Sequence, residues 1–221
     1  MAVRMKIDFV SDVSCPWCAI GLQSLEAALE KLRGDIEADL HFQPFELNPD
    51  MGRGGESILE HLAGKYGSTP DQLERSQEMI RARGAELGFV FDMHKRTHIY
   101  NTFDAHRLLH WAEEEGRQRA LKHALFTAYF TEGRDPSDHD VLIDLATRVG
   151  LDAERARQIL AADEFANEVR DRERFYLEHG IRAVPAVVIN DRHLIEGGQP
   201  AKVFEQALRQ LATAGTGSPA A

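Results

Sequence analysis

Ser14-Cys15-Pro16-Trp17-Cys18 closes the apolar run Ile7-Asp8-Phe9-Val10 and opens a helical pattern. The 221 residues contain only two cysteines, and both lie in this stretch, separated by two residues. The first turn of a helix leaves backbone N–H groups unpaired and carries a partial positive charge. A thiolate is stabilised at such a position. We therefore expect Cys15, at or just before the first turn, to be the attacking sulfur of a redox-active pair.

The other residues of this stretch fit the same arrangement. Cys18 lies one turn further along the helix, and we expect it to be the more buried thiol, which resolves a mixed disulfide formed on Cys15. Pro16 suits the first helical position, because proline loses no hydrogen bond there and already has a helical φ. We expect Trp17 to be exposed and to offer a client molecule an apolar contact near the reacting sulfur.

Other uses of the two cysteines fit the sequence less well. A structural disulfide across so short a loop would remove little entropy from the unfolded chain. A zinc site needs three or four ligands, and the sequence has no second Cys-x-x-Cys pair and no close histidine pair beside the cysteines. We therefore expect no metal site, and we favour redox chemistry over inert, packed cysteines.

The composition indicates a globular protein with a substantial core, because 43% of the residues are hydrophobic. A net charge of −10 argues against nucleic acid or an anionic membrane surface as a partner. The sequence has no run of about 18 apolar residues, which a membrane span would need. It also begins without a hydrophobic signal region. We expect a cytoplasmic location, where a close cysteine pair is typically catalytic or redox-sensing.

The periodicity predicts β-α-β at the start of the chain. A strand over 6–10 is followed by a helix over 16–32, whose apolar residues recur three and four apart. Apolar and polar residues alternate over 36–45, which predicts a second strand, and such a unit is typical of a parallel pair. Helical patterns then cover 70–87, 102–115, 117–130 and 137–149. Ser137 is expected to cap the last of these, and further helices are expected to begin near Asp152 and Asp163.

A strand pattern returns over 184–189 and 192–196, joined by a turn at Asn190-Asp191, and a final helix is predicted over 200–211. Without the helical middle, these elements form a four-stranded mixed sheet with helices on both faces. The predicted fold is therefore α/β and thioredoxin-like (β-α-β … α-β-β-α), with an inserted all-helical domain. We assign 1–48 and 166–213 to the thioredoxin-like domain, 49–165 to the insert and 214–221 to a disordered tail.

Val184-Pro185 is the second element of the predicted site. A plain strand start would explain this proline, because the first residue of a strand tolerates one. Only about 5–6% of X-Pro bonds in folded proteins are cis. In a thioredoxin layout, however, a proline here faces the dithiol, so we expect a cis bond. That bond would leave the N–H and C=O of Val184 free to pair with an extended substrate.

Three separated segments resemble the DsbA family, and its FrnE-like branch most. They are 11–18 (SDVSCPWC), 101–108 (NTFDAHRL) and 180–185 (GIRAVP). The resemblance spans nearly the whole chain and implies a thioredoxin fold with a helical insert. It further implies dithiol–disulfide exchange through Cys15 and Cys18, with Pro185 as the family's cis-proline. One small departure is Arg182-Ala183, where many FrnE-like proteins have a glycine.

The resemblance also places the segment of Asn101, Thr102 and His106 against the dithiol. These three residues, together with Pro16, Trp17, Val184 and Pro185, are the expected substrate-binding residues. Simpler roles stay open for two of them. Thr102 suits an ordinary helix N-cap, and His106 suits a hydrogen-bonded packing position.

Two acidic residues near the dithiol have alternative roles. Asp12 is expected to form a turn or cap, because short acids are favoured in such loops, and the alternative is a proton acceptor for Cys18. Asp8 lies within the first strand and needs a partner if it is buried.

We expect a thiol–disulfide oxidoreductase or isomerase with no tightly bound cofactor, acting on protein or small-molecule thiols and disulfides. Glutathione or another thiol reductant fits as a co-substrate, and the apolar insert helices could support a homodimer. One rival is a glutathione-dependent isomerase or transferase, like the related 2-hydroxychromene-2-carboxylate isomerases and kappa-class transferases. Those relatives typically have serine at the position of Cys15. A second rival is a non-catalytic partner-binding or redox-sensing protein.

Overall fold

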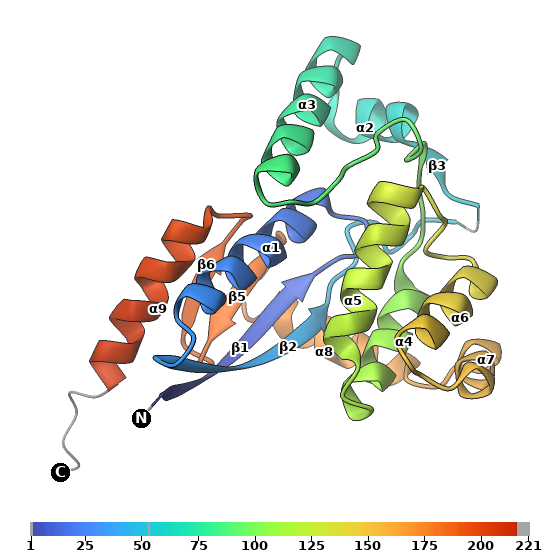
Figure 1. Ribbon diagram of the computed structural model, residues 1–221. Coiled ribbons are helices and arrows are strands. Elements are labelled where there is room, and N and C mark those ends of the chain that lie inside the picture. Colours follow the sequence, from blue (N-terminus) through green and yellow to red (C-terminus); the bar gives the residue numbers. More distant parts are fainter. Residues whose placement is uncertain (1, 53, 216–221) are drawn as a thin grey trace.

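A four-stranded sheet with the order β2-β1-β5-β6 lies at the centre of the protein (Figure 1). The computed structural model describes residues 2–52 and 54–215. β1 runs parallel to β2 and antiparallel to β5, and β6 completes a hairpin with β5. The strands are β1 (Val3–Ser11), β2 (Ile36–Pro44), β5 (Ala186–Ile189) and β6 (His193–Glu196). The predicted thioredoxin layout, with its parallel first pair, is confirmed.

Helices cover both faces of this sheet, as predicted. Figure 1 shows α1 and α9 side by side on one face, whereas α8 packs on the opposite face and contacts β2. The helices are α1 (Pro16–Lys31), α2 (Ile58–Tyr66), α3 (Pro70–Glu86), α4 (Phe103–Glu114), α5 (Gln118–Thr127), α6 (His139–Arg148), α7 (Ala153–Ala161), α8 (Ala166–Glu178) and α9 (Ala201–Gly215). A π-helical turn, η1 (Ala128–Glu132), continues α5.

The alternation along β1 explains the two layers. Met5, Ile7 and Phe9 belong to the core that β1 shares with α1 and α9, whereas Val10 packs with Tyr176 of α8. Asp8 is also buried, and its carboxylate accepts a hydrogen bond from Gln43 Nε2 at 2.7 Å and lies 3.0 Å from Lys6 Nζ. The predicted need for a partner at this position is therefore met.

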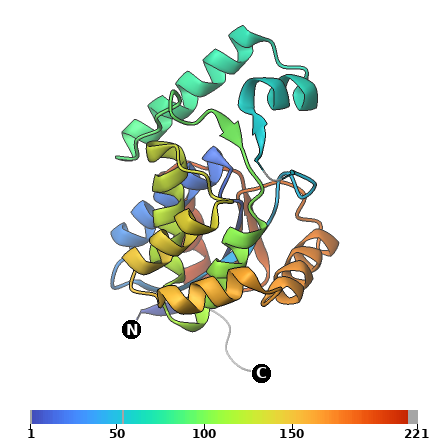
Figure 2. The ribbon, with the colours of Figure 1, turned by 90° about the vertical axis from the view of Figure 1, so that its right-hand side faces the viewer.

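The insert has a core of its own, formed by α4, α5, α6 and α7. Figure 2 shows α2 and α3 as a separate layer above the rest of the molecule. The insert is not all-helical, because β3 (Glu56–Ser57) pairs antiparallel with β4 (His98–Ile99). Each of these strands has two residues, which is too short for any alternation of polar and apolar residues to mark it in the sequence.

Several predicted element ends need correction. Asp138, not Ser137, caps α6, because its carboxylate reaches the N–H groups of Asp140 and Val141, while Ser137 donates to Asp135. The N-cap residue of α8 is Phe165, whereas the sequence predicted that this helix begins near Asp163.

The C-terminal elements also shift. β5 begins at Ala186, after the proline, and α9 extends to Gly215, past the predicted end at Leu211. The rest of the predicted tail, 216–221, lies outside the described residues.

No helix in the described part of the chain combines the length and the apolar character that crossing a bilayer requires.

Gln118 joins the insert to the sheet. Its side-chain oxygen accepts a hydrogen bond from the N–H of Phe42 at 2.9 Å, and its side-chain nitrogen donates to the C=O of Phe42 at 3.0 Å. β2 is an edge strand of the four-stranded sheet. Gln118, the first residue of α5, therefore forms hydrogen bonds with the N–H and the C=O of Phe42 on the side of β2 where no other strand of the described chain lies.

We predict that Gln118→Leu lowers the free energy of unfolding by about 1–3 kcal/mol, because it leaves a buried N–H and C=O unpaired. Urea denaturation followed by circular dichroism measures this loss. Gln158→Leu, on the exposed surface of α7, is the control and should stay within about 0.5 kcal/mol of wild type. Equal stability of the Gln118→Leu and wild-type proteins would contradict the assignment.

Candidate active site

Cys15 is the N-cap residue of α1, as predicted. Its backbone is extended (φ −89°, ψ 113°), and Pro16 occupies the first helical position. The helix follows β1 after a tight loop in which the N–H of Cys15 donates to the C=O of Asp12 at 3.3 Å. Cys15 therefore lies at the start of α1, where the partial positive charge of the helix is concentrated.

Cys18 lies one turn further along α1 and is fully buried, whereas Cys15 is 4% exposed. Both are free thiols. Burial raises the pKa of Cys18 well above that of an ordinary thiol, and the adjacent Cys15 sulfur raises it further. The positive charge of Lys122 acts in the opposite direction. The difference in burial agrees with the predicted division between an attacking and a resolving sulfur.

The Val184-Pro185 peptide bond is cis, as predicted. Cys15 Sγ donates to the C=O of Val184 at 3.8 Å, across 169 residues of sequence. Gly21 of α1 allows this approach, because a Cβ at that position would lie only 3.0 Å from Pro185 Cγ. Within the described chain, the N–H of Val184 donates no hydrogen bond.

A cleft of about 490 Å³ opens over the dithiol. Cys15, Pro16 and Trp17 form part of its wall, and the loop 182–184 forms another part. α2 and α3 lie along the cleft and contribute mainly apolar and neutral polar side chains. Four basic side chains also line it: His61, Lys65, Arg96 and Arg182.

Trp17 differs from its predicted exposure. It is half-buried and packs against the core of the sheet. The backbone of Gly198 lies close to it, because a Cβ on Gly198 would approach the Trp17 ring to 3.3 Å and the Trp17 carbonyl oxygen to 2.9 Å. The Trp17 residue therefore lines the cleft and also packs against the core and the backbone of Gly198.

Asp12 forms the turn that precedes the dithiol. Its carboxylate accepts hydrogen bonds from the N–H and the hydroxyl of Ser14, at 3.1 and 2.9 Å, and from the N–H of Leu47 at 2.7 Å. His106 Nε2 lies 3.7 Å away. Burial raises the pKa of Asp12, but the His106 ring and these N–H groups outweigh it and lower the pKa below its usual value. The turn role is the one these contacts support.

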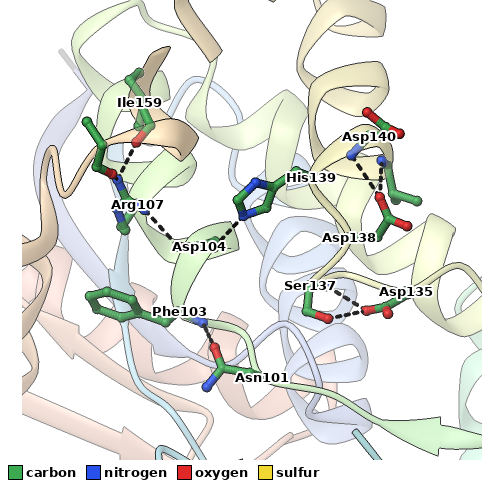
Figure 3. Close-up of polar contacts among 12 residues, drawn as sticks. Asn101, Phe103, Asp104, Arg107, Asp135, Ser137, Asp138, His139, Asp140 and Ile159 are labelled. Atoms are coloured by element: carbon green, nitrogen blue, oxygen red, sulfur yellow. Dashed lines mark hydrogen bonds and ion pairs between the residues drawn. The ribbon is translucent and has the colours of Figure 1, made fainter. Parts of the chain in front are cut away.

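Asn101, Thr102 and His106 do not line the cleft. Asn101 accepts a hydrogen bond from the N–H of Phe103 at 2.9 Å, which caps α4 (Figure 3), and donates to the C=O of Met51. Thr102, although it is the N-cap residue, makes no capping bond with its side chain and is buried. His106 is 3% exposed, so its ring cannot reach a client. The contact of these three residues with a substrate stays a prediction, since none of them lines this cleft and, within the described chain, only Asn101 has side-chain hydrogen bonds, both of them to the backbone.

Figure 3 also shows what holds this end of α4. Asp104 binds Arg107 at 2.7 Å and the ring of His139 at 2.8 Å, and Arg107 donates to the C=O of Ile159. These contacts join α4 to α6 and α7. They belong to the insert and do not extend to the dithiol.

Two basic residues near the dithiol were not predicted. Arg96, in the loop before β4, donates to the C=O of Ser14 at 3.4 Å, and its guanidinium lies 5.0 Å from the centre of the Tyr129 ring. Lys122, on α5, is fully buried. Neither residue belongs to a motif, and a lysine on an amphipathic helix is usually exposed. No signal in the sequence distinguishes them from surface residues.

Glu46, Glu173 and Arg170 form a second group of charged side chains, in which the two carboxylates are buried. Glu46, just after β2, binds Arg170 of α8, which also binds Glu173 at 2.7 Å. Burial and the neighbouring Glu173 carboxylate raise the pKa of Glu46 to about 7, although His106 and Arg170 lower it. Its ordinary value is 4.5, so the folded protein favours the protonated form of Glu46.

The stability that protonated Glu46 contributes is complete below pH 4.5 and is lost as pH rises through about 7. We predict that Glu46→Gln, which cannot ionise, melts about 2–4 °C above wild type at pH 8. The two proteins should converge near pH 4.5. Thermal melts at both pH values, followed by circular dichroism, measure the difference. A gap that is the same at both pH values would contradict the assignment.

Comparison with known proteins identifies the family. The model of the DSBA-like thioredoxin domain matches residues 6–209. A crystal structure of a probable DsbA oxidoreductase from Streptomyces coelicolor is 35% identical, with a TM-score of 0.90, and the match covers 98% of this chain and 93% of that one. The uncharacterized protein YwbO of Bacillus subtilis is 28% identical over 94% of this chain and 96% of its own length.

A 2-hydroxychromene-2-carboxylate isomerase shares the fold, at 16% identity and a TM-score of 0.71, over 96% of this chain and all of its own. The family model covers nearly the whole chain, including Cys15, Cys18 and Pro185. This chain belongs to the DSBA-like thioredoxin domain family.

Proposed function

We propose that this protein is a thiol–disulfide oxidoreductase that acts through Cys15 and Cys18. The observation that carries the proposal is the 3.8 Å contact between Cys15 Sγ and the C=O of Val184, where the cleft opens. A sulfur at a helix start, next to an unused backbone N–H, is placed to receive both the sulfur and the backbone of a client. The FrnE-like branch stays a prediction.

In the first step, the Cys15 thiolate attacks one sulfur of a client disulfide. A bond forms between Cys15 and that sulfur, and the other client sulfur leaves as a thiolate. The positive end of α1 stabilises the thiolate of Cys15. The N–H and C=O of Val184 would pair with the client backbone, as in the addition of a strand to a sheet edge.

In the second step, Cys18 attacks Cys15 Sγ, the Cys15–Cys18 disulfide forms, and the second client sulfur leaves. Run backwards, the same two steps transfer a disulfide to a client dithiol. The reduction potential of the pair relative to its partner sets the direction. The buried position of Cys18 suits this role, because only the sulfur of Cys15 faces the cleft.

We predict that Cys15→Ser abolishes turnover in the reduction of a disulfide substrate, whereas Cys18→Ser accumulates a mixed disulfide on Cys15. The first variant loses the attacking sulfur, and the second loses the sulfur that releases the client. Turnover of insulin disulfides and mass spectrometry of trapped adducts measure these outcomes. Full activity of Cys15→Ser would exclude the mechanism. Adducts without turnover in wild type would favour the redox-sensing or partner-binding alternative.

Glutathione is a second candidate, as co-substrate or as the cofactor of an isomerase or transferase. The observation that favours it is the set of basic side chains along the cleft, in a chain whose net charge is −10. Lys65 and Arg182 are exposed to solvent at the cleft. Glutathione has two carboxylates and a thiol, and charged hydrogen bonds from Lys and Arg suit carboxylates.

We predict that wild type binds glutathione saturably and that Lys65→Met combined with Arg182→Met weakens this binding about tenfold or more. A loss of that size equals about 1.4 kcal/mol, which is in the range of hydrogen bonds to charged groups. Calorimetric titration of the Cys15→Ser variant, which excludes covalent adducts, measures the affinity. The matched control replaces Lys202 and Arg192, which lie outside the cleft lining, with methionine. Equal affinity in both double variants would contradict this site.

A further inference from the structure

Lys122 is a fully buried lysine without a hydrogen-bond partner. Its side chain is 0% exposed, and its Nζ makes no hydrogen bond to any group in the described part of the chain. The ring of Phe126 packs against this charge, and its centre lies 4.9 Å from Nζ. Burying a cation without a partner costs several kcal/mol, so a lysine at this position needs a physical reason.

Helix α5 holds Lys122 against the helix that carries the dithiol. Glu26 of α1 accepts a hydrogen bond from Arg119 Nε at 2.6 Å and contacts the ring of His123 at 2.9 Å. Figure 1 shows α5 beside α1. Phe126, one turn beyond Lys122, belongs to the same core cluster as Cys15 and Cys18. The Lys122 ammonium is thus enclosed in the interior, against a ring of the core cluster that also contains the two thiols.

Lys122 interacts electrostatically with three ionisable groups: Cys18 of α1, Cys15 at the N-cap of α1, and Asp12 of the preceding loop. Burial lowers the pKa of Lys122 to about 8, and these groups oppose the shift, Cys18 most strongly. Asp12 already accepts three hydrogen bonds and has His106 beside it. The anion that lacks a counter-charge elsewhere is therefore the thiolate of Cys18.

We propose that Lys122 is a positioning residue, the buried counter-charge that stabilises the Cys18 thiolate while Cys18 resolves the mixed disulfide. This inference rests on the proposed function. Cys18 releases its proton to the buffer, and its thiolate attacks Cys15 Sγ. The Cys15–Cys18 bond forms as the bond from Cys15 to the client sulfur breaks. The client sulfur leaves as a thiolate with the bonding electron pair, while the ammonium of Lys122 keeps its charge throughout.

The two steps are separable with 5,5′-dithiobis(2-nitrobenzoate), an aromatic disulfide that releases a coloured thiolate at each step. Reduced protein mixed with one equivalent should release a first thiolate as Cys15 attacks and a second as Cys18 resolves. Cys18→Ser should show the first phase alone. Absence of a second phase in wild type would reject the proposed function itself, whatever the role of Lys122.

Lys122→Met keeps the aliphatic volume and removes the charge. We expect its second phase to be about tenfold slower than that of wild type at pH 7, with the midpoint of the rate–pH profile raised by about one unit. Arg117→Met removes one positive charge from the exposed residue that precedes the same helix and is the matched control. It should keep the wild-type profile. A folded Lys122→Met protein with the wild-type second phase would overturn the inference.

A second measurement covers the case in which Lys122→Met does not fold. Lysine labelled with ¹³C at Cε reports the titration of Lys122 by NMR in the reduced wild-type and Cys18→Ser proteins. If Lys122 is the counter-charge of Cys18, its titration midpoint should fall when Cys18 is replaced, because the thiolate no longer stabilises the ammonium. An unchanged midpoint in Cys18→Ser would overturn the inference without any substitution of Lys122.

Discussion

The antiparallel pairing of β1 with β5 is the constraint on which the site depends. Val10 pairs with Ala186, so the segment that follows β1 and the segment that precedes β5 lie at the same end of the sheet. The first carries the dithiol and the second carries the cis-proline. Two segments separated by about 170 residues are thereby placed in contact. The hydrogen-bond register of the sheet, and no local signal, sets the distance between Cys15 and Val184.

The insert contributes to the site at this end of the sheet in two ways. Figure 1 shows α2 and α3 above α1, and side chains of both helices line the cleft together with those of the dithiol segment. α4 contributes His106, whose ring lies 3.7 Å from Asp12, and α5 contributes the buried Lys122. Gln118 fastens this layer to β2 through both backbone groups of Phe42. The insert therefore contributes to the lining of the cleft and also supplies buried basic side chains to the core around the thiol segment.

Periodicity and turn chemistry predicted most of the elements. The helix from Pro16, the strand pair β1–β2 and the β5–β6 hairpin depend on nearest neighbours in the chain, so a local pattern identifies them. The same reasoning could not detect β3 and β4, because a strand of two residues is too short to show an alternation of polar and apolar residues. It also misjudged Trp17, because its burial comes from Gly198, which is about 180 residues away in the chain.

By itself, the sequence determined the chemistry: two thiols in one turn at a helix start, and a proline before a late strand. These features are local, since a helix N-terminus and a Cys-x-x-Cys spacing act over a few residues. Only the tertiary structure decided which basic side chains are buried near the thiol segment. Lys122, Arg96 and His106 come from segments that are far from the two cysteines in the chain. The local sequence pattern around a lysine, arginine or histidine is the same whether its side chain is exposed to solvent or buried. Burial, which depends on every packed neighbour, makes the difference.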